Sequence, residues 1–288
     1  MIVRSLFVTL GLLLVWSLVA PRLPRDTDWE LPLRTANVER AQDHLYAVPS
    51  GEEAVLLGSS LSELLPLDSV AGYPLRSLAL SGMGVADGLA VLEYVDRTPA
   101  IILVETNLID KVADDAFQDQ VLGTISRKTR YYLPALRQRN QPATALLRTL
   151  FYLKNGPPKD QDADELPPRP LNERMLELRR EEYAVAPGAD EFSLTAGELT
   201  QRLEVFRERG SQVVFFELPV HPDLCTTPRA LAVRAGLQDI LPPAAFTRLP
   251  EPDCAAFRTT DGHHLDPESA RRFARELEER VNHLTSPR

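Results

Sequence analysis

The chain has 288 residues, of which 44% are hydrophobic and 25% charged, as in folded proteins with room for a large core. Its formal net charge of −9 is the opposite of the basic face that binds phosphates, so we expect no nucleic-acid partner. No metal-ligand spacing is present, because His263 and His264 are adjacent and cannot easily face one ion. We therefore expect neither a metal nor a cofactor.

A nearly unbroken apolar run covers residues 5–20, after Arg4. It lies at the short end of the ~20 residues that a membrane-spanning helix needs, and it equally fits the core of a signal peptide. Because Pro21 makes cleavage there awkward, we favour an uncleaved, single-pass anchor over residues 1–21. Either interpretation exports the remaining chain. The expected location is the cell membrane with the domain on its periplasmic side, although the flanking charges orient the anchor only weakly.

Residues 22–49 carry charges and prolines and predict a stalk or a lead-in helix. The main domain follows over residues 50–288. It opens by alternating short apolar runs, typical of buried strands, with segments of helical spacing. The predicted strands are 54–57, 77–80 and 100–104, and the predicted helices are 61–65 and 85–95. This alternation indicates βαβ units and a parallel sheet.

The pattern changes over about residues 110–190, which we interpret as a helical insertion. Tyrosine and leucine residues between 131 and 153 suggest one or two helices, and the Pro- and Asp-rich segment 155–171 suggests a mobile loop. The insertion could form a helical cap or a partner-binding surface, or it could be an excursion without a function of its own. The sequence does not separate these alternatives.

Regular α/β structure returns after the insertion. A helix is predicted over residues 195–209, a strand over 212–218, and a helix over 231–241 with a short strand after it. Asp266 and Pro267 are typical of the N-cap and the first residue of a helix. One apolar stripe along this last helix is expected to pack against the sheet.

Ser60, Gly82 and Asn107 each follow the end of one of the first three predicted strands. In parallel sheets the ligand site lies beyond these carboxyl ends. Asp261 precedes His264 by three residues in the turn before the last helix, so its carboxylate could hold the imidazole. Taken singly, each of these residues could be only a helix cap, a turn former or a loop residue.

Taken together, the same residues predict a hydrolytic site. If the fold brings the two turns together, Ser60, His264 and Asp261 form a catalytic triad. His264 would accept the proton of the Ser60 hydroxyl, and Asp261 would fix the tautomer of the ring. The expected oxyanion donors are the backbone N–H groups of Ser60 and Gly82 and the side-chain amide of Asn107.

Three further residues are candidates for a structural or binding role. Cys225 and Cys254 form an even pair in an exported domain, which suggests a disulfide; the alternative is two isolated thiols. His221 comes just after the predicted strand 212–218, and its position makes it a candidate substrate contact.

The order of these motifs resembles that of the SGNH (GDSL-type) hydrolase superfamily, whose four blocks supply serine, glycine, asparagine and histidine. Here the blocks are Gly58-x-Ser60-Leu61, Gly82, Asn107 and Asp261-Gly262-x-His264-Leu265. The resemblance covers roughly residues 50–110 and 210–285. It implies a three-layer α/β/α sandwich with a flavodoxin-like parallel sheet, and it implies the same catalytic and oxyanion roles.

Three positions depart from the family pattern. Ser59 stands where the family often has aspartate, Glu105 replaces a glycine, and Leu108 replaces an aspartate. We expect these changes to affect substrate shape more than the oxyanion role. An α/β-hydrolase lipase is a weaker alternative, because Ser62 stands where its sharp nucleophile turn needs a glycine.

An N-terminal anchor joined to such a domain resembles the envelope polysaccharide O-acetyltransferases and acetyl esterases. Some of these work beside a multi-spanning membrane O-acyltransferase. The resemblance implies serine-dependent hydrolysis or transfer of an O-acyl (acetyl) ester on a carbohydrate. The alternative is a catalytically idle SGNH-fold scaffold that binds a partner or a glycan, which the Glu105 departure and the long insertion would favour.

Overall fold

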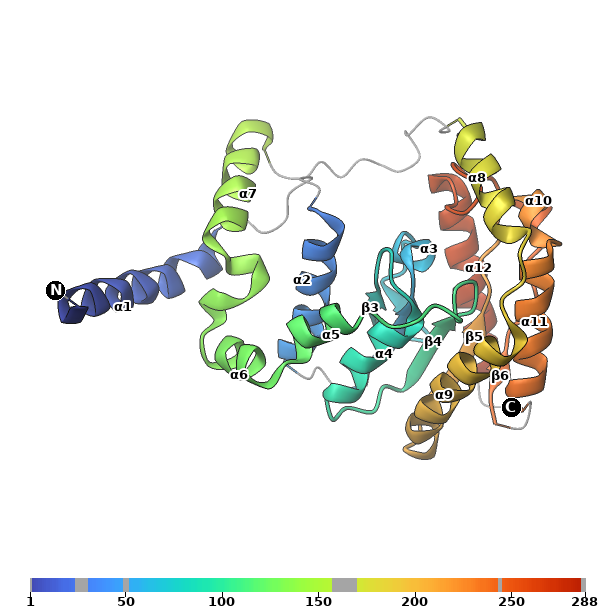
Figure 1. The fold of residues 1–288 in the computed structure, drawn as a ribbon, viewed down its shortest axis with the longest axis horizontal. Coiled ribbons are helices and arrows are strands. Elements are labelled where there is room, and N and C mark those ends of the chain that lie inside the picture. Colours follow the sequence, from blue (N-terminus) through green and yellow to red (C-terminus); the bar gives the residue numbers. More distant parts are fainter. Residues whose placement is uncertain (1, 24–30, 49–51, 157–169, 243–244, 286–288) are drawn as a thin grey trace. The chain divides into compact units, whose positions relative to one another are not determined.

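The computed structural model describes residues 2–23, 31–48, 52–156, 170–242 and 245–285 (Figure 1). The chain divides into two compact units, each of which combines two segments distant in sequence. Unit 1 comprises Met1–Ala47 and Asp115–Gln161, and unit 2 comprises Val48–Asp114 and Asp162–Arg288. The first part of the predicted insertion thus groups with the N-terminal segment. Most of the predicted loop 155–171 lies outside the described residues.

Unit 2 is built on a six-stranded sheet within the described residues, in the order β2-β3-β1-β4-β5-β6. The strands are β1 (Ala54–Gly58), β2 (Ser69–Val70), β3 (Tyr73–Ala79), β4 (Ile101–Glu105), β5 (Gln212–Phe216) and β6 (Thr247–Arg248). All neighbouring pairs are parallel except β2 with β3. The fold is therefore α/β with a mixed, mostly parallel sheet.

The expectation of a wholly parallel sheet was wrong at the β2 edge. Ala71 and Gly72 join β2 to β3 and both have positive φ, of 52° and 80°. Two such residues suit the tight turn of a two-residue hairpin, which reverses the chain at once. The sequence signal is weak, because alanine occupies a position where asparagine or glycine is usual.

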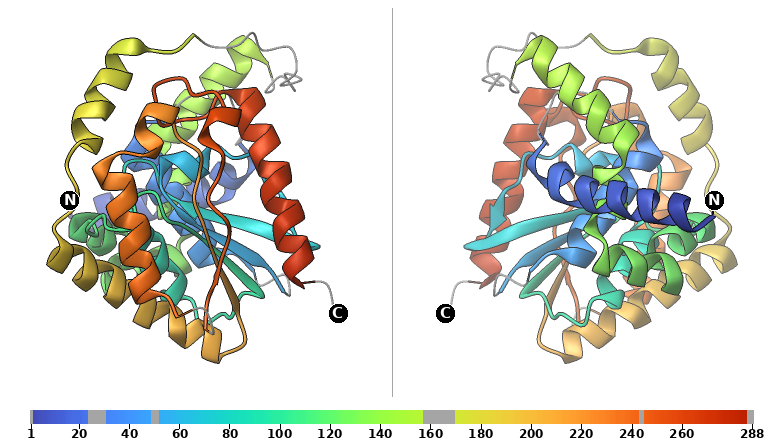
Figure 2. Two further views of the ribbon diagram at one scale, coloured as in Figure 1. Left: turned by 90° about the vertical axis from the view of Figure 1, so that its right-hand side faces the viewer. Right: turned by 90° about the vertical axis from the view of Figure 1, so that its left-hand side faces the viewer.

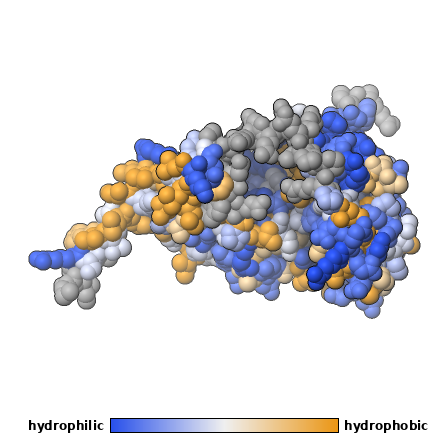
Figure 3. All heavy atoms as spheres, turned by 90° about the horizontal axis from the view of Figure 1, so that it is seen from above, coloured by the Kyte–Doolittle hydropathy of each residue, from blue (hydrophilic) through white to orange (hydrophobic). Residues whose placement is uncertain are grey.

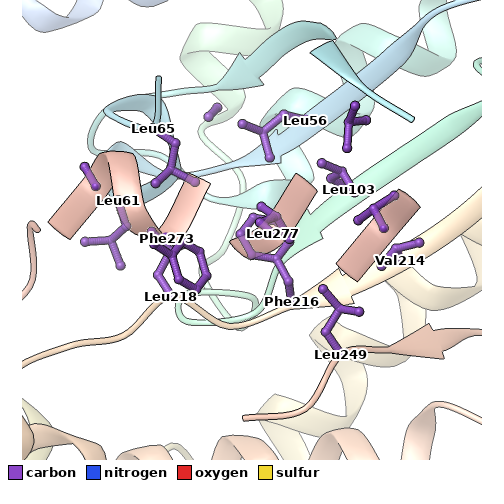
Figure 4. Packing of buried hydrophobic residues seen from close by; sticks show 14 of the residues in the cluster. Leu56, Leu61, Leu65, Leu103, Val214, Phe216, Leu218, Leu249, Phe273 and Leu277 are labelled. Atoms are coloured by element: carbon purple, nitrogen blue, oxygen red, sulfur yellow. The ribbon is translucent and has the colours of Figure 1, made fainter. Parts of the chain in front are cut away.

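The central strands are buried on both faces, as their continuous apolar runs predict. Every residue of β1 and β4 is buried. On one face α12 (Pro267–Thr285) packs Phe273 and Leu277 against apolar side chains of the strands (Figure 4). Asp266 caps this helix, because its Oδ1 accepts the N–H of Ser269 at 2.8 Å.

The other face of the sheet is covered by α4 (Val85–Tyr94), whose Gly88 lies directly against β3. A Cβ at Gly88 would come within 2.5 Å of the Leu78 carbonyl oxygen and 3.3 Å of the Leu57 side chain. Helices thus lie on both faces of the sheet (Figure 2). The remaining helices of unit 2 are α3 (Ser60–Glu63), α8 (Glu173–Tyr183), α9 (Ala189–Glu208), α10 (Pro222–Cys225) and α11 (Pro228–Ile240).

Unit 1 is helical in its described residues. It contains α1 (Ile2–Val19), α2 (Leu33–Tyr46), α5 (Asp115–Leu122), α6 (Thr124–Tyr132) and α7 (Pro142–Asn155). The stretch 131–153, predicted to hold one or two helices, contains the end of α6 and most of α7, as expected. Among the described residues no helix has the length and apolarity of a membrane span, and the N-terminal anchor stays a prediction.

A disulfide joins Cys225, the last residue of α10, to Cys254, with their Cα atoms 6.4 Å apart. Both sulfur-bearing residues belong to a small apolar cluster that includes Leu176 and Tyr183 of α8 and Leu224 of α10. The disulfide therefore holds α10 beside α8, the helix whose Leu176 lies against Gly262.

Candidate active site

The register of the sheet sets the position of the site. Gly58 of β1 pairs with Ala79 of β3, Leu57 pairs with Val104, and Glu105 of β4 pairs with Phe216. These strands consequently end in one row. The loops that carry Ser60, Gly82 and Asn107 leave the same edge of the sheet, with the Ser60 loop in the middle.

Ser59 and Ser60 have different tasks at the end of β1. Ser59 is the N-cap of α3, and its Oγ accepts the N–H of Leu61 at 3.2 Å. The Oγ of Ser60 instead lies 3.0 Å from Nε2 of His264, a residue 204 positions further along the chain. The capping role that either serine could have taken thus falls to Ser59 alone.

Asp261 holds the imidazole of His264 from the opposite side. Its Oδ2 lies 2.7 Å from Nδ1 of His264, and its Oδ1 accepts the backbone N–H groups of His263 and His264 at 3.0 and 2.8 Å. Gly262 sits between them with φ of +93°, and a Cβ there would also come within 2.9 Å of Leu176 on α8. Glycine suits this turn because it adopts a positive φ readily and has no Cβ to clash with Leu176.

These contacts fix the charge of the carboxylate. Burial alone raises the pKa of Asp261, but the hydrogen bonds from the ring and backbone of His264 and from the backbone of His263 outweigh it. The pKa of Asp261 is therefore well below its usual range. An ionised Asp261 accepts the Nδ1 proton of His264, which leaves Nε2 as an acceptor for the Ser60 hydroxyl.

The candidate oxyanion donors lie on three loops. Ser60 is the first residue of α3, so its N–H has no preceding turn of helix to bond. Gly82 has φ of +72° and lies in a turn that Met83 closes by donating to Leu80. Its own N–H is not the one that closes the turn.

Asn107 is held firmly at its place. Its Nδ2 donates to the Leu218 carbonyl at 2.9 Å, and its Oδ1 accepts the Leu218 N–H at 2.8 Å. The two bonds tie the loop after β4 to the loop after β5. They orient the amide and use one of its two Nδ2 protons, so the second remains for an oxyanion.

Glu105 is a site residue whose role the sequence did not reveal. It is buried at the end of β4, and its carboxylate accepts four hydrogen bonds from residues 59–62, which we call the serine turn. Ser59 donates through its N–H at 2.8 Å and its Oγ at 2.7 Å, and Ser62 through its N–H at 3.3 Å and its Oγ at 2.6 Å. The side chain points into the turn that carries Ser60, so the expected effect on substrate shape finds no support here.

Gly58 makes room for this carboxylate. A Cβ at Gly58 would come within 2.0 Å of the Ser62 Oγ and 2.6 Å of Glu105 Oε2. The glycine before the two serines and the glutamate at the end of β4 thus belong to one packing arrangement.

His221 lies beside the turn that carries Asp261 and His264. Its backbone N–H donates to the Gly262 carbonyl at 2.8 Å, and its ring Nδ1 accepts the N–H of Asp223 at 3.3 Å, which caps α10. These contacts give it a structural role, and the substrate contact stays a prediction. In the described part of the chain no three His, Cys, Asp or Glu side chains gather as metal ligands would.

His263, which directly precedes His264, has a more buried environment. It is buried, its ring centroid lies 4.8 Å from that of Tyr183, and its Nε2 has no hydrogen-bond partner among the described residues. Burial lowers the pKa of His263 to about 4, and the positive charge of Arg179 adds to the effect.

This burial predicts a loss of stability in mild acid. Unfolded His263 takes up a proton near pH 6.5, whereas folded His263 stays neutral down to about pH 4. The free energy of unfolding should fall by about 3 kcal/mol as the pH drops between these values. For His263→Phe, which keeps a ring against Tyr183, the free energy of unfolding measured with urea should change less over this pH range. If the free energy of unfolding fell equally with pH in both proteins, His263 would not be the cause of the loss.

Comparison of the chain with protein-family models, with curated proteins and with solved structures finds no match. The functional interpretation therefore depends on the geometry of the site.

Proposed function

We propose that this protein is a membrane-anchored, serine-dependent O-acyl esterase or O-acyltransferase of SGNH type that acts on a carbohydrate through an acyl-enzyme on Ser60. One observation carries the proposal. Ser60 Oγ, the ring of His264 and the Asp261 carboxylate form a continuous chain with contacts of 3.0 and 2.7 Å. This is the geometry in which a base removes the proton of a nucleophile while a third group orients the base.

The topology supports the superfamily assignment. Without the β2 hairpin, the parallel strands follow the order β3-β1-β4-β5-β6. This is the 2-1-3-4-5 order of flavodoxin-like sheets. With helices on both faces, it fits the three-layer α/β/α sandwich that the SGNH resemblance implies.

The proposed reaction has two steps. Ser60 Oγ attacks the acyl carbonyl carbon while its proton passes to His264 Nε2, and Ser60 N–H, Gly82 N–H and Asn107 Nδ2 stabilise the oxyanion. The leaving alcohol takes the proton from His264, and the acyl group remains on Ser60. Water or a sugar hydroxyl then gives its proton to His264 and attacks the acyl-enzyme. The bond from the acyl group to Ser60 Oγ breaks, and His264 returns the proton to Ser60.

The choice between hydrolysis and transfer is tested by following acetate from p-nitrophenyl acetate with and without an oligosaccharide acceptor. A transferase moves acetate onto the sugar at the expense of free acetate, whereas an esterase releases free acetate in both cases. Release of p-nitrophenol no faster than in buffer, from folded protein, would contradict both. A cell-envelope polysaccharide as acceptor, and a membrane O-acyltransferase as partner, belong to the same proposal.

The idle scaffold is the second candidate, and the site geometry counts against it. It was motivated by Glu105, which the family pattern does not contain, and by the long insertion. In the structure Glu105 accepts hydrogen bonds from the turn that holds Ser60. A residue that orients a nucleophile is placed in this way.

A further inference from the structure

Helix α7 of unit 1 has its apolar face outward. Its inner face carries Arg148, whose Nη2 lies 2.8 Å from Glu39 Oε2 on α2, and both side chains are largely buried. Its outer face carries four exposed leucines spaced by one, three and three residues, as along one side of a helix: Leu146, Leu147, Leu150 and Leu153.

Helix α6, which precedes α7 in unit 1, also exposes apolar and aromatic side chains. Ile125 is 84% exposed, and Tyr131 and Tyr132 are 64% and 76% exposed. We call these three residues and the four leucines of α7 the α6–α7 surface. Exposed apolar groups on this scale mark a surface that meets another apolar phase or partner.

The charge of this segment is opposite to that of the chain. Residues 123–156 contain no Asp or Glu, and they contain seven basic residues: Arg127, Lys128, Arg130, Arg137, Arg139, Arg148 and Lys154. Arg139 and Arg148 pair with carboxylates of α2. Lys128 and Lys154, on α6 and α7, are exposed. The net charge of the whole chain is −9, so the cationic character is local to this segment.

The segment is joined directly to the N-terminal helix. Trp16, near the end of α1, donates its ring N–H to the carbonyl of Asn140 at 2.7 Å, two residues before α7 begins. The described side chains of α1 are mostly exposed leucine, valine and phenylalanine. Figure 3 shows hydrophobic residues along α1 and onto the adjoining part of unit 1.

We propose that the α6–α7 surface lies on the lipid bilayer that α1 enters, as a second, peripheral membrane contact. The leucines and Ile125 would enter the boundary between headgroups and acyl chains, where Tyr131 and Tyr132 also find their preferred place. Lys128 and Lys154 would meet anionic headgroups. The occupant is lipid because exposed leucines, tyrosines and lysines adjoin a helix that is itself proposed to enter the bilayer.

The inference rests on the proposed membrane anchor, and its test separates the two. Both native cysteines are in the disulfide, so one added cysteine can be labelled selectively. An environment-sensitive fluorophore is placed at Leu150→Cys on α7, at Leu12→Cys on α1, or at Leu194→Cys, an exposed leucine of α9 in unit 2. Each full-length protein is reconstituted into protein-free vesicles that contain phosphatidylglycerol, with spin-labelled lipid as the quencher.

The labels at 12 and 150 should lose most of their fluorescence to the lipid quencher, and the label at 194 should keep most of its fluorescence. Quenching at position 12 but not at position 150 would contradict the membrane contact of the α6–α7 surface and would still support α1 as the membrane anchor. Absence of quenching at both positions would overturn both. Shielding of position 150 only in native membranes would indicate a protein partner and would also overturn the proposal.

A charge-reversal pair tests the headgroup contact. Lys128→Glu with Lys154→Glu should weaken quenching at 150 in anionic vesicles and leave quenching at 12 unchanged. Equal quenching at 150 with and without the two substitutions would reject the role of the lysines.

Discussion

Ser60→Ala should remove the turnover of p-nitrophenyl acetate while the protein stays folded. The hydroxyl contacts the His264 ring, the base that would take its proton in the proposed mechanism. Loss of a triad serine lowers kcat by on the order of 10⁴–10⁶-fold, and binding and the oxyanion donors account for what remains. Steady-state kinetics measure the effect, and a thermal melt checks the fold.

Ser193→Ala is the matched control, because Ser193 is an exposed serine on α9. This variant should keep the kinetics and the melting temperature of the parent protein. Full turnover in Ser60→Ala would remove the proposed mechanism, since the nucleophile would then lie elsewhere.

Glu105→Gln should impair both the stability and the chemistry of the site. The carboxylate accepts two N–H and two O–H groups from Ser59 and Ser62, and an amide turns one acceptor oxygen into a donor facing those groups. A buried group left without a partner costs about 1–3 kcal/mol. A turn displaced by even 1 Å costs on the order of 10²-fold in rate. We therefore expect Glu105 to act as a positioning residue for Ser60.

The test of Glu105 separates positioning from bulk stability. Glu217→Gln is the matched control, because Glu217 follows β5 and is bonded to Arg234 at 2.6 Å, not to the serine turn. Both variants should unfold at lower urea concentration, but only Glu105→Gln should lower kcat with little change in KM. Equal loss of stability with kcat unchanged in both would reduce Glu105 to a structural residue.

The sheet and the contacts among Ser60, His264 and Asp261 could be predicted because both leave local signals. Strands buried on two faces appear as continuous apolar runs, and the loops after parallel strands necessarily share one edge. The Asp261-x-x-His264 turn is short enough for its geometry to follow from spacing alone. The meeting of Ser60 with His264 then required only that both loops reach the same edge.

Other features depend on contacts that no local pattern reveals. From the sequence, Glu105 was only a departure from a family motif. Its role could not be predicted, because the four groups that donate to it lie in a turn more than 40 residues earlier. Arg148 of α7 pairs with Glu39 of α2, and these two residues are 109 positions apart in the sequence. Helical periodicity finds the apolar stripe of α7 but cannot tell whether the stripe faces inward, and here its leucines are exposed on the protein surface.

The most direct measurement of the central claim is the site at which a fluorophosphonate reacts, determined by peptide mass mapping. The proposed mechanism predicts one adduct per chain, on Ser60, and no adduct in His264→Ala, where the base is missing. A folded protein that gives no adduct, or gives it on another residue, would contradict the assignment of Ser60 as the nucleophile.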